Sequence, residues 1–224
     1  MSNEFCPKSR RAVNDWIIWQ IADSAFPIGG FAHSAGLEAA WRGGEIPSPA
    51  ALHGFLHSAL HQCAGGLLPI ALIAFREAPV ICHADELCDL FLNHPVPNRA
   101  SRAMGRALIS TMRQIHPAYA NVDLPPTHFA PALGLICRRL SLPEIQLARL
   151  LLHMTLRSTI SAAIRLGIIG PLAGQSIQLS FAPLAESLSR RALGADPEDI
   201  AQTSPIADLF QGCHDRLYSR LFQS

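Results

Sequence analysis

Apolar residues recur with the period of an α-helix along most of the chain, and no alternating strand pattern lasts as long as a normal strand. Glycine and proline break this pattern into segments of helix length. Gly43-Gly44 and Ser48-Pro49, for example, are residue types that end one helix and begin the next. The sequence therefore predicts an all-α protein, a single compact bundle of about eight to ten helices.

Several helix boundaries can also be predicted from caps and breakers. Ser141-Leu142-Pro143-Glu144 is typical of a capping box, and it should open a long helix that reaches about Leu166. The other expected helices cover residues 13–24, 32–41, 48–63 with a continuation to 75 after Gly65-Gly66, 85–94, 99–115, 127–140, 172–193 with a kink at Pro183, and 205 to about 222.

The composition indicates one globular unit, residues 1–224, that is partly covered by protein partners. Hydrophobic residues make up 49% of the chain and charged residues 16%, a balance that excludes extensive disorder. The net charge of +1 provides no general attraction to nucleic acid or to anionic lipid. Few charges and a mean hydropathy of +0.21 favour a surface used for protein contacts.

The N-terminus and the apolar runs predict a cytoplasmic protein. Residues 1–12 carry charges with no apolar stretch behind them, so they form no secretory signal, and we expect them to be flexible. The longest apolar run, 67–75, contains Pro69 and is far shorter than the roughly 20 residues of a membrane span. The six cysteines include no CxxC pair, and thiols stay reduced in an unexported chain.

No recognisable catalytic motif is present. The single lysine, Lys8, does not end a glycine-rich phosphate loop, and no HExxH zinc helix occurs. The stretch Ala32-His33-Ser34-Ala35-Gly36 faintly resembles a nucleophile elbow, but an elbow needs a strand before the serine. The sequence therefore predicts a protein that is not an enzyme and has no tightly bound cofactor.

Three histidines, His53, His57 and His61, share one face of a predicted helix. Since an α-helix rises 1.5 Å per residue, His53 and His61 lie about 12 Å apart and cannot chelate the same ion. His57 and His61 are therefore weak metal candidates, and a partly exposed polar stripe is the favoured interpretation. Cys82-His83 with Cys88 is a second weak group of the same kind.

Polar residues also recur every four positions on the otherwise apolar helix that follows Glu144, at His153, Arg157, Ser161 and Arg165. An arginine in such a helix needs an acceptor or water, because an unpaired buried charge is costly. Two alternatives stay open here: internal ion pairs, or a polar seam that faces a partner or a water-filled cavity.

Four segments spread over nearly the whole chain form a recognisable set. The first is Ile21–Glu38, which contains Phe26-Pro27-Ile28-Gly29-Gly30. The other three segments are Asn98–Arg106, Ser161–Gln175 and His214–Ser224. In this order they resemble the urease accessory protein UreF family, most closely over the first segment. Two positions depart from the family pattern: Met104 stands where glutamine is common, and Asp215 replaces the more usual glutamate.

This resemblance implies an all-helical, typically dimeric scaffold without catalytic activity. Such a protein binds the accessory protein UreD (UreH in some organisms) and the GTPase UreG, and the complex delivers nickel to apo-urease. Nickel is then handled by the complex and is not a resident cofactor of this chain. The alternatives are a regulator of the UreG GTPase cycle and, less favoured, a metal-dependent helical enzyme that uses His53, His57 and His61.

The resemblance also implies two sets of contact residues. Residues 205–224 should form a helix and tail that dock UreD or UreH, through His214, Tyr218, Arg220, Leu221 and Phe222. Contacts with UreG or with a second copy of the chain are expected from Pro27, Gly29, Gly30, Glu38, Arg102, Arg106 and Arg165.

Overall fold

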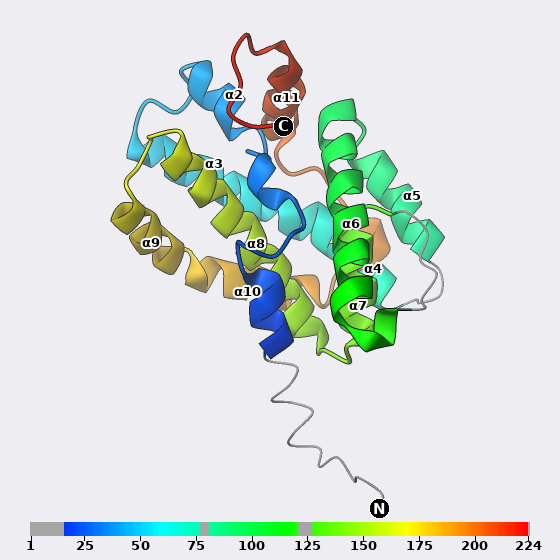
Figure 1. The fold of residues 1–224 in the computed structure, drawn as a ribbon. Coiled ribbons are helices and arrows are strands. Elements are labelled where there is room, and N and C mark those ends of the chain that lie inside the picture. The colour runs from blue at the N-terminus through cyan, green and yellow to red at the C-terminus, as the bar shows by residue number, and fades with distance from the viewer. Residues whose placement is uncertain (1–15, 77–80, 121–126, 224) are drawn as a thin grey trace, which may run out of the picture.

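The computed structural model describes residues 16–76, 81–120 and 127–223. Over these residues the chain is an all-α bundle with no strand, which confirms the predicted class (Figure 1). Residues 16–22 are helical. The helices that follow are α2 (Leu37–Arg42), α3 (Pro49–Gln62), α4 (Leu68–Arg76), α5 (Ile81–Phe91), α6 (Pro95–Ile115), α7 (Phe129–Arg139), α8 (Glu144–Arg165), α9 (Pro171–Ser180), α10 (Ala182–Ala192) and α11 (Pro205–Cys213). The predicted flexible residues 1–12 lie outside the described part.

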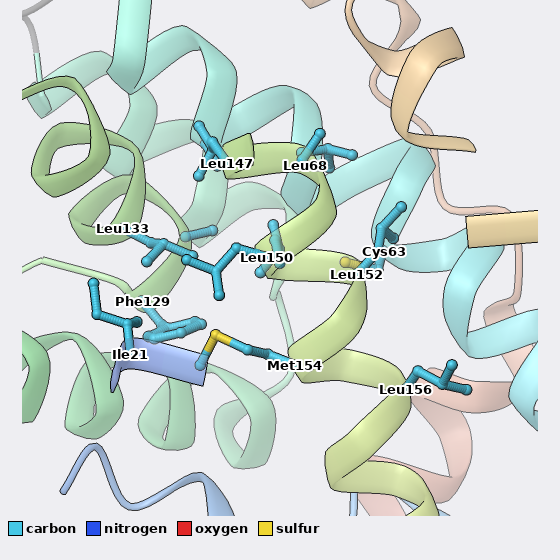
Figure 2. Close-up of a cluster of buried hydrophobic side chains, with 14 of the residues drawn as sticks. Ile21, Cys63, Leu68, Phe129, Leu133, Leu147, Leu150, Leu152, Met154 and Leu156 are labelled. Carbon is cyan, nitrogen blue, oxygen red and sulfur yellow. The ribbon is translucent and has the colours of Figure 1, made fainter. Parts of the chain in front are cut away.

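Helix α8 runs through the middle of the bundle and packs against α3, α4, α7 and α10. Leu147, Leu150 and Leu152 are buried on different sides of it, so the helix is covered nearly all round (Figure 2). Each buried leucine contributes roughly 1.5–3 kcal/mol from the removal of apolar surface from water. The sequence prediction of one long helix here is confirmed.

Helices α3 and α4 form one continuous helical run that is interrupted by a π-helical turn at Cys63–Leu67. Pro69 has no N–H to donate to the Gly65 carbonyl, and Ala201 N donates to that carbonyl instead at 2.9 Å. The predicted irregularity at Gly65-Gly66 is therefore confirmed. By length and composition the Pro49–Arg76 run could cross a membrane, but 67% of its most apolar window is buried in the bundle, as in a core helix.

The structure also corrects predicted boundaries: α2 begins at Leu37 rather than at residue 32, and α5 covers Ile81–Phe91 rather than 85–94. Four further differences have an identifiable physical reason. Helix α6 begins at Pro95 rather than Arg99, because a proline fits the first turn and His94 Nδ1 accepts a hydrogen bond from Val96 N at 3.3 Å. The predicted capping box is wrong: Ser141 has a positive φ of 55° and makes no cap bond to α8. The predicted helix over 172–193 is two helices that meet at Phe181, with Pro183 in the first turn of α10.

The fourth correction concerns the C-terminus. The last α-helix ends at Cys213 and not near Phe222, and after a short 3-10 turn at His214–Arg216 the chain continues without regular structure. We call residues 217–223 the tail. Figure 1 shows that α11 and the tail lie beside α2, although α2 belongs to the N-terminal part of the sequence.

Candidate functional site

The first matched segment forms an ordered loop over residues 23–36, which we call the N-terminal loop. Asp23 Oδ1 accepts a hydrogen bond from Ala25 N at 2.7 Å. Gly29 has a φ of 76° and Gly36 a φ of 86°, torsions that residues with a side chain rarely adopt. A Cβ on Gly36 would also lie 3.0 Å from Gln211 N of α11. The glycines therefore serve both the shape of the loop and its close approach to α11.

The N-terminal loop and the polar seam of α8 face each other across a cavity of about 480 Å³. The loop contributes Pro27, Gly29 and Phe31, and the seam contributes Arg157, Ser161 and Arg165. Sequence reasoning proposed these two features separately, and the structure brings them together in one place. Gln175 and Gln178 of α9 close a further side of the cavity.

Of the two arginines in the seam, Arg157 has fewer hydrogen-bond partners in the described part of the chain. It is half-buried, and among the described residues no hydrogen-bond partner lies within reach of its Nε. Burial lowers the pKa of the guanidinium, and the nearby Asp23 carboxylate partly opposes that shift. Burial and Arg157 together also lower the pKa of His153 one turn earlier. At this position the seam therefore faces an open space rather than an internal ion pair.

Arg165 has a different environment from Arg157. Its guanidinium carbon lies 3.8 Å from the ring centre of Phe31 and 4.2 Å from that of Phe222. Arg165 also donates to the Phe31 carbonyl. This side chain therefore fastens the N-terminal loop and the tail to α8. Its contact to UreG or to a second copy stays a prediction.

Glu38 is also engaged by its own chain. The resemblance implies that Glu38 contacts UreG or a second copy, but Glu38 is fully buried, at 0% exposure. Its two carboxylate oxygens accept hydrogen bonds from Leu221 N at 2.8 Å and from Phe222 N at 3.1 Å. Gln223 N donates to the Ala32 carbonyl at 2.7 Å. The tail is thus held by the N-terminal loop and α2 of its own chain.

The predicted UreD contacts divide between the interior and the surface. Phe222 is buried in the core, whereas Tyr218 and Leu221 are exposed, Tyr218 completely. Arg220 forms an ion pair with Asp215 at 3.1 Å, and Asp215 also pairs with Arg99 of α6. The side chain of His214 lies outside the described residues. Two further apolar side chains on α11, Ile206 and Leu209, are also exposed, and the sequence analysis did not single them out.

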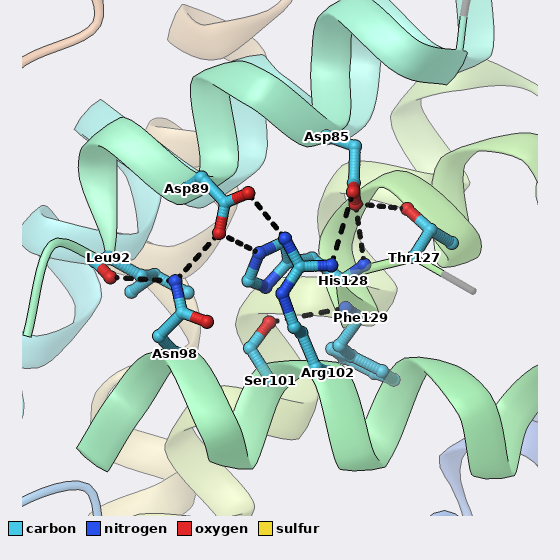
Figure 3. Close-up of polar contacts among 9 residues, drawn as sticks. All are labelled: Asp85, Asp89, Leu92, Asn98, Ser101, Arg102, Thr127, His128 and Phe129. Atoms are coloured by element: carbon cyan, nitrogen blue, oxygen red, sulfur yellow. Dashed lines mark hydrogen bonds and ion pairs between the residues drawn. The ribbon is translucent and has the colours of Figure 1, made fainter. Parts of the chain in front are cut away.

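The second matched segment fastens three helices to one another (Figure 3). Arg102 of α6 forms ion pairs with Asp85 and Asp89 of α5. Asn98 donates to Asp89 at 2.8 Å, and Ser101 Oγ accepts from Phe129 N of α7 at 3.2 Å. Arg102 is thus the central cation of a structural cluster, and its predicted contact to UreG or to a second copy stays a prediction. Arg106, one turn further along α6, is exposed.

The same cluster contains the side chains best placed to hold a metal ion in the described part of the chain. Ligand atoms of Asp85, Asp89 and His128 lie within 4.8 Å of one another. However, Arg102 already forms an ion pair with each carboxylate. Asp85 Oδ1 also accepts a hydrogen bond from His128 N at 2.7 Å, and His128 Nε2 lies 2.9 Å from Asp89 Oδ1. The arrangement suits a structural ion-pair network better than a cation site. No spacing in the sequence predicts this cluster, because Asp85 and Asp89 lie 43 and 39 positions before His128.

The cluster predicts a specific pH dependence of stability. Hydrogen bonds from Asn98 and His128 lower the pKa of Asp89 below its ordinary 3.8. Asp89 therefore stabilises the folded state above the unfolded-chain pKa, and this contribution is lost as the pH falls through the lowered folded value. We expect Asp89→Asn to cost about 1 kcal/mol at pH 7, because the side chain is 43% exposed and solvent screens its pairs.

Urea unfolding at pH 7 and at pH 3 would test this expectation. The difference between the wild type and Asp89→Asn should shrink at the lower pH. Glu86→Gln on the same helix removes an exposed carboxylate and should leave stability unchanged at both values. A difference for Asp89→Asn that is the same at both pH values would contradict the electrostatic explanation.

The structure also places the three histidines of α3 and the serine of the elbow-like stretch. His57 and His61 stack with ring centres 4.4 Å apart, whereas His53 packs against Phe181 at 5.5 Å. Ser34 is buried, and its Oγ accepts a hydrogen bond from Glu38 N at 3.4 Å. No strand precedes it within the described residues, so this serine lacks the setting of a nucleophile.

Together, the fold and the site define a class of all-α protein in which an N-terminal loop, one central helix and a C-terminal tail carry the sequence motifs and meet in space. Residues 46–182 match the family model UreF. Urease accessory protein F of Oryza sativa is 34% identical over 219 residues, covering 92% of this chain and 84% of the relative. The Arabidopsis thaliana protein of that name is 34% identical (93% and 92%), and urease accessory protein UreF of Paracoccus denitrificans is 33% identical (92% and 94%). The chain belongs to the UreF family of urease accessory proteins.

Proposed function

We propose that this protein is a non-enzymatic scaffold in urease maturation, which bridges UreD or UreH and the GTPase UreG so that nickel reaches apo-urease. Membership of the UreF family supports a role in urease maturation. The observation that carries the finer proposal is the convergence of the N-terminal loop, the α8 seam and the tail. Three family motifs that are far apart in the sequence meet there and leave apolar side chains exposed around them.

The C-terminal segment has the properties of a docking surface. Ile206, Leu209, Tyr218 and Leu221 are exposed although they are apolar or aromatic. Tyrosine is enriched among the residues that dominate binding energy. The main-chain hydrogen bonds that Glu38 accepts and the burial of Phe222 fix the main chain beneath Tyr218 and Leu221. A surface that is ordered before binding loses less conformational entropy when a partner docks. We therefore assign UreD or UreH to this segment.

The contacts to UreG or to a second copy are proposed for the loop side of the molecule. The predicted residues most accessible to a partner are Pro27 and Gly29, which are exposed, Gly30, which is partly exposed, and Arg106 on α6, which is exposed. A Cβ on Gly30 would lie 3.3 Å from the Met104 side chain, so the loop rests on α6 at Met104. If this contact regulates the GTPase cycle instead of only recruiting UreG, purified protein will change the GTP hydrolysis rate of UreG.

The docking proposal predicts that Tyr218→Ala combined with Leu221→Ala weakens capture of the cognate UreD. Loss of one dominant aromatic residue costs about 2 kcal/mol or more, which corresponds to roughly 30-fold in Kd. Both side chains are exposed, so the fold should survive the change. The measurement is co-purification of the two proteins, followed by a binding titration.

The matched control is Leu172→Ala combined with Leu179→Ala, which removes two exposed leucines from α9. This variant should bind UreD like the wild type. Equal capture by both variants would remove the C-terminal segment from the docking surface. Point substitutions are preferable to a chain that ends at Thr203, because that truncation would remove α11 from its contacts with α2 and α6.

A further inference from the structure

Two histidines on the surface of α3 form a pair that neither the fold nor the scaffold role requires. His57 and His61 are one helical turn apart, with ring centres 4.4 Å apart and ring planes inclined by 35°. His57 is exposed and His61 partly exposed, so solvent reaches both rings. Within the described residues, neither ring makes a hydrogen bond to another side chain or to the main chain. Their nitrogens are therefore available to a ligand from solution.

The spacing suits chelation by both side chains. A divalent transition metal binds a histidine nitrogen at about 2.0–2.1 Å, so two nitrogens that share an ion lie up to about 4 Å apart. Small rotations of the side chains can bring one nitrogen of each ring to that separation. Both residues lie on the same regular helix, α3, which fixes their main-chain positions before any ion arrives.

The surroundings of His61 also suit a metal ion. A metal binds the neutral form of imidazole. Burial, His57 and Arg191 lower the pKa of His61, in that order of importance, which favours its neutral form. Arg191 belongs to α10, and its positive charge opposes a bound cation as well as a bound proton. These observations indicate a site that exchanges its ion and does not retain it.

We propose that His57 and His61 form an exchangeable, two-nitrogen site for a late divalent transition-metal ion, with water completing the coordination. Imidazole is a preferred ligand for nickel, copper and zinc ions, which is the chemical class that we assign. The proposal goes beyond the scaffold role, because a scaffold can organise partners without touching the cargo. It is also independent of that role, since it is tested on the isolated chain.

Calorimetric titration of the full chain with NiCl2, and separately with ZnCl2, tests the site. The protein should carry no affinity tag, and Cys6, Cys82 and Cys213 should be replaced by serine so that these thiols do not compete. Binding by the second imidazole is intramolecular once the first has bound. We therefore expect His57→Gln or His61→Gln to weaken binding by on the order of 100-fold.

Three comparisons make the result specific. His53→Gln, which alters the neighbouring ring on the same face, should bind like the wild type, and Arg191→Gln should bind more tightly. Circular dichroism would confirm that the variants are folded. The proposal is overturned if the wild type binds neither ion, or if the His57→Gln and His61→Gln proteins bind as tightly as the His53→Gln control. Capture of UreD stays unchanged in either case, which separates this test from that of the scaffold role.

Discussion

Gly105→Ala is expected to lower the free energy of unfolding by about 3 kcal/mol, the upper range for a side chain forced into a filled space. A Cβ at this position would lie 2.0 Å from the Thr127 carbonyl oxygen and 2.8 Å from the His128 carbonyl carbon. Both are main-chain atoms, so neither can rotate aside. Helix α6 must therefore move away from the start of α7, which also stretches the bond between Ser101 and Phe129.

Gly54→Ala provides the matched control for that substitution. Gly54 is exposed on α3, and nothing lies within 4 Å of a Cβ built on it. Alanine has a higher helix propensity than glycine, so this variant should be more stable by about 1 kcal/mol. Urea unfolding of both proteins measures the two effects with opposite signs. A Gly105→Ala protein as stable as the wild type would mean that α6 and α7 are not in close contact.

The helical periodicity was sufficient to predict the fold class, because every long helix buries an apolar face. Helix ends were less predictable, since they depend on contacts that are remote in the sequence. Residues 217–223 have enough apolar residues for a helix, yet their amides at Leu221 and Phe222 bond to Glu38 instead of to the preceding turn. The helices predicted over 85–94 and 99–115 leave Pro95 between them, yet Pro95 occupies the first turn of α6, where a proline is tolerated.

The candidate site was predicted in parts but not as a whole. The sequence indicated the N-terminal loop, the α8 seam and the tail, but no spacing rule places residue 31 beside residue 222. The roles of the charged residues were the least predictable feature. Glu38, Arg102 and Arg165 are charged residues of the kind that usually lie on the surface. In the structure each of them contacts a group of its own chain that is more than ten positions away. Asp85, Asp89 and His128 went unnoticed for the same reason.

Glu38→Gln is expected to release the tail more often while leaving the bundle folded. Hydrogen bonds to a charged acceptor contribute about 1.5–3 kcal/mol each, and glutamine keeps one of the two acceptor oxygens. A loss of about 2 kcal/mol corresponds to a roughly 30-fold larger population of undocked tail. Because the tail has no regular structure and lies outside the helices of the bundle, it can open without global unfolding. Amide hydrogen exchange at Leu221 and Phe222 should accelerate by that factor.

Glu45→Gln makes the same chemical change at an exposed position near the end of α2, and it should leave the exchange of both amides unaltered. Equal exchange in the two variants would show that Glu38 does not hold the tail. The affinity for UreD then distinguishes two ways of docking. If the partner binds the docked tail, affinity falls by the fraction of docked molecules that is lost. If Glu38→Gln instead binds UreD more tightly, the partner captures the released tail, and the ordered surface seen here is the state that binding must open.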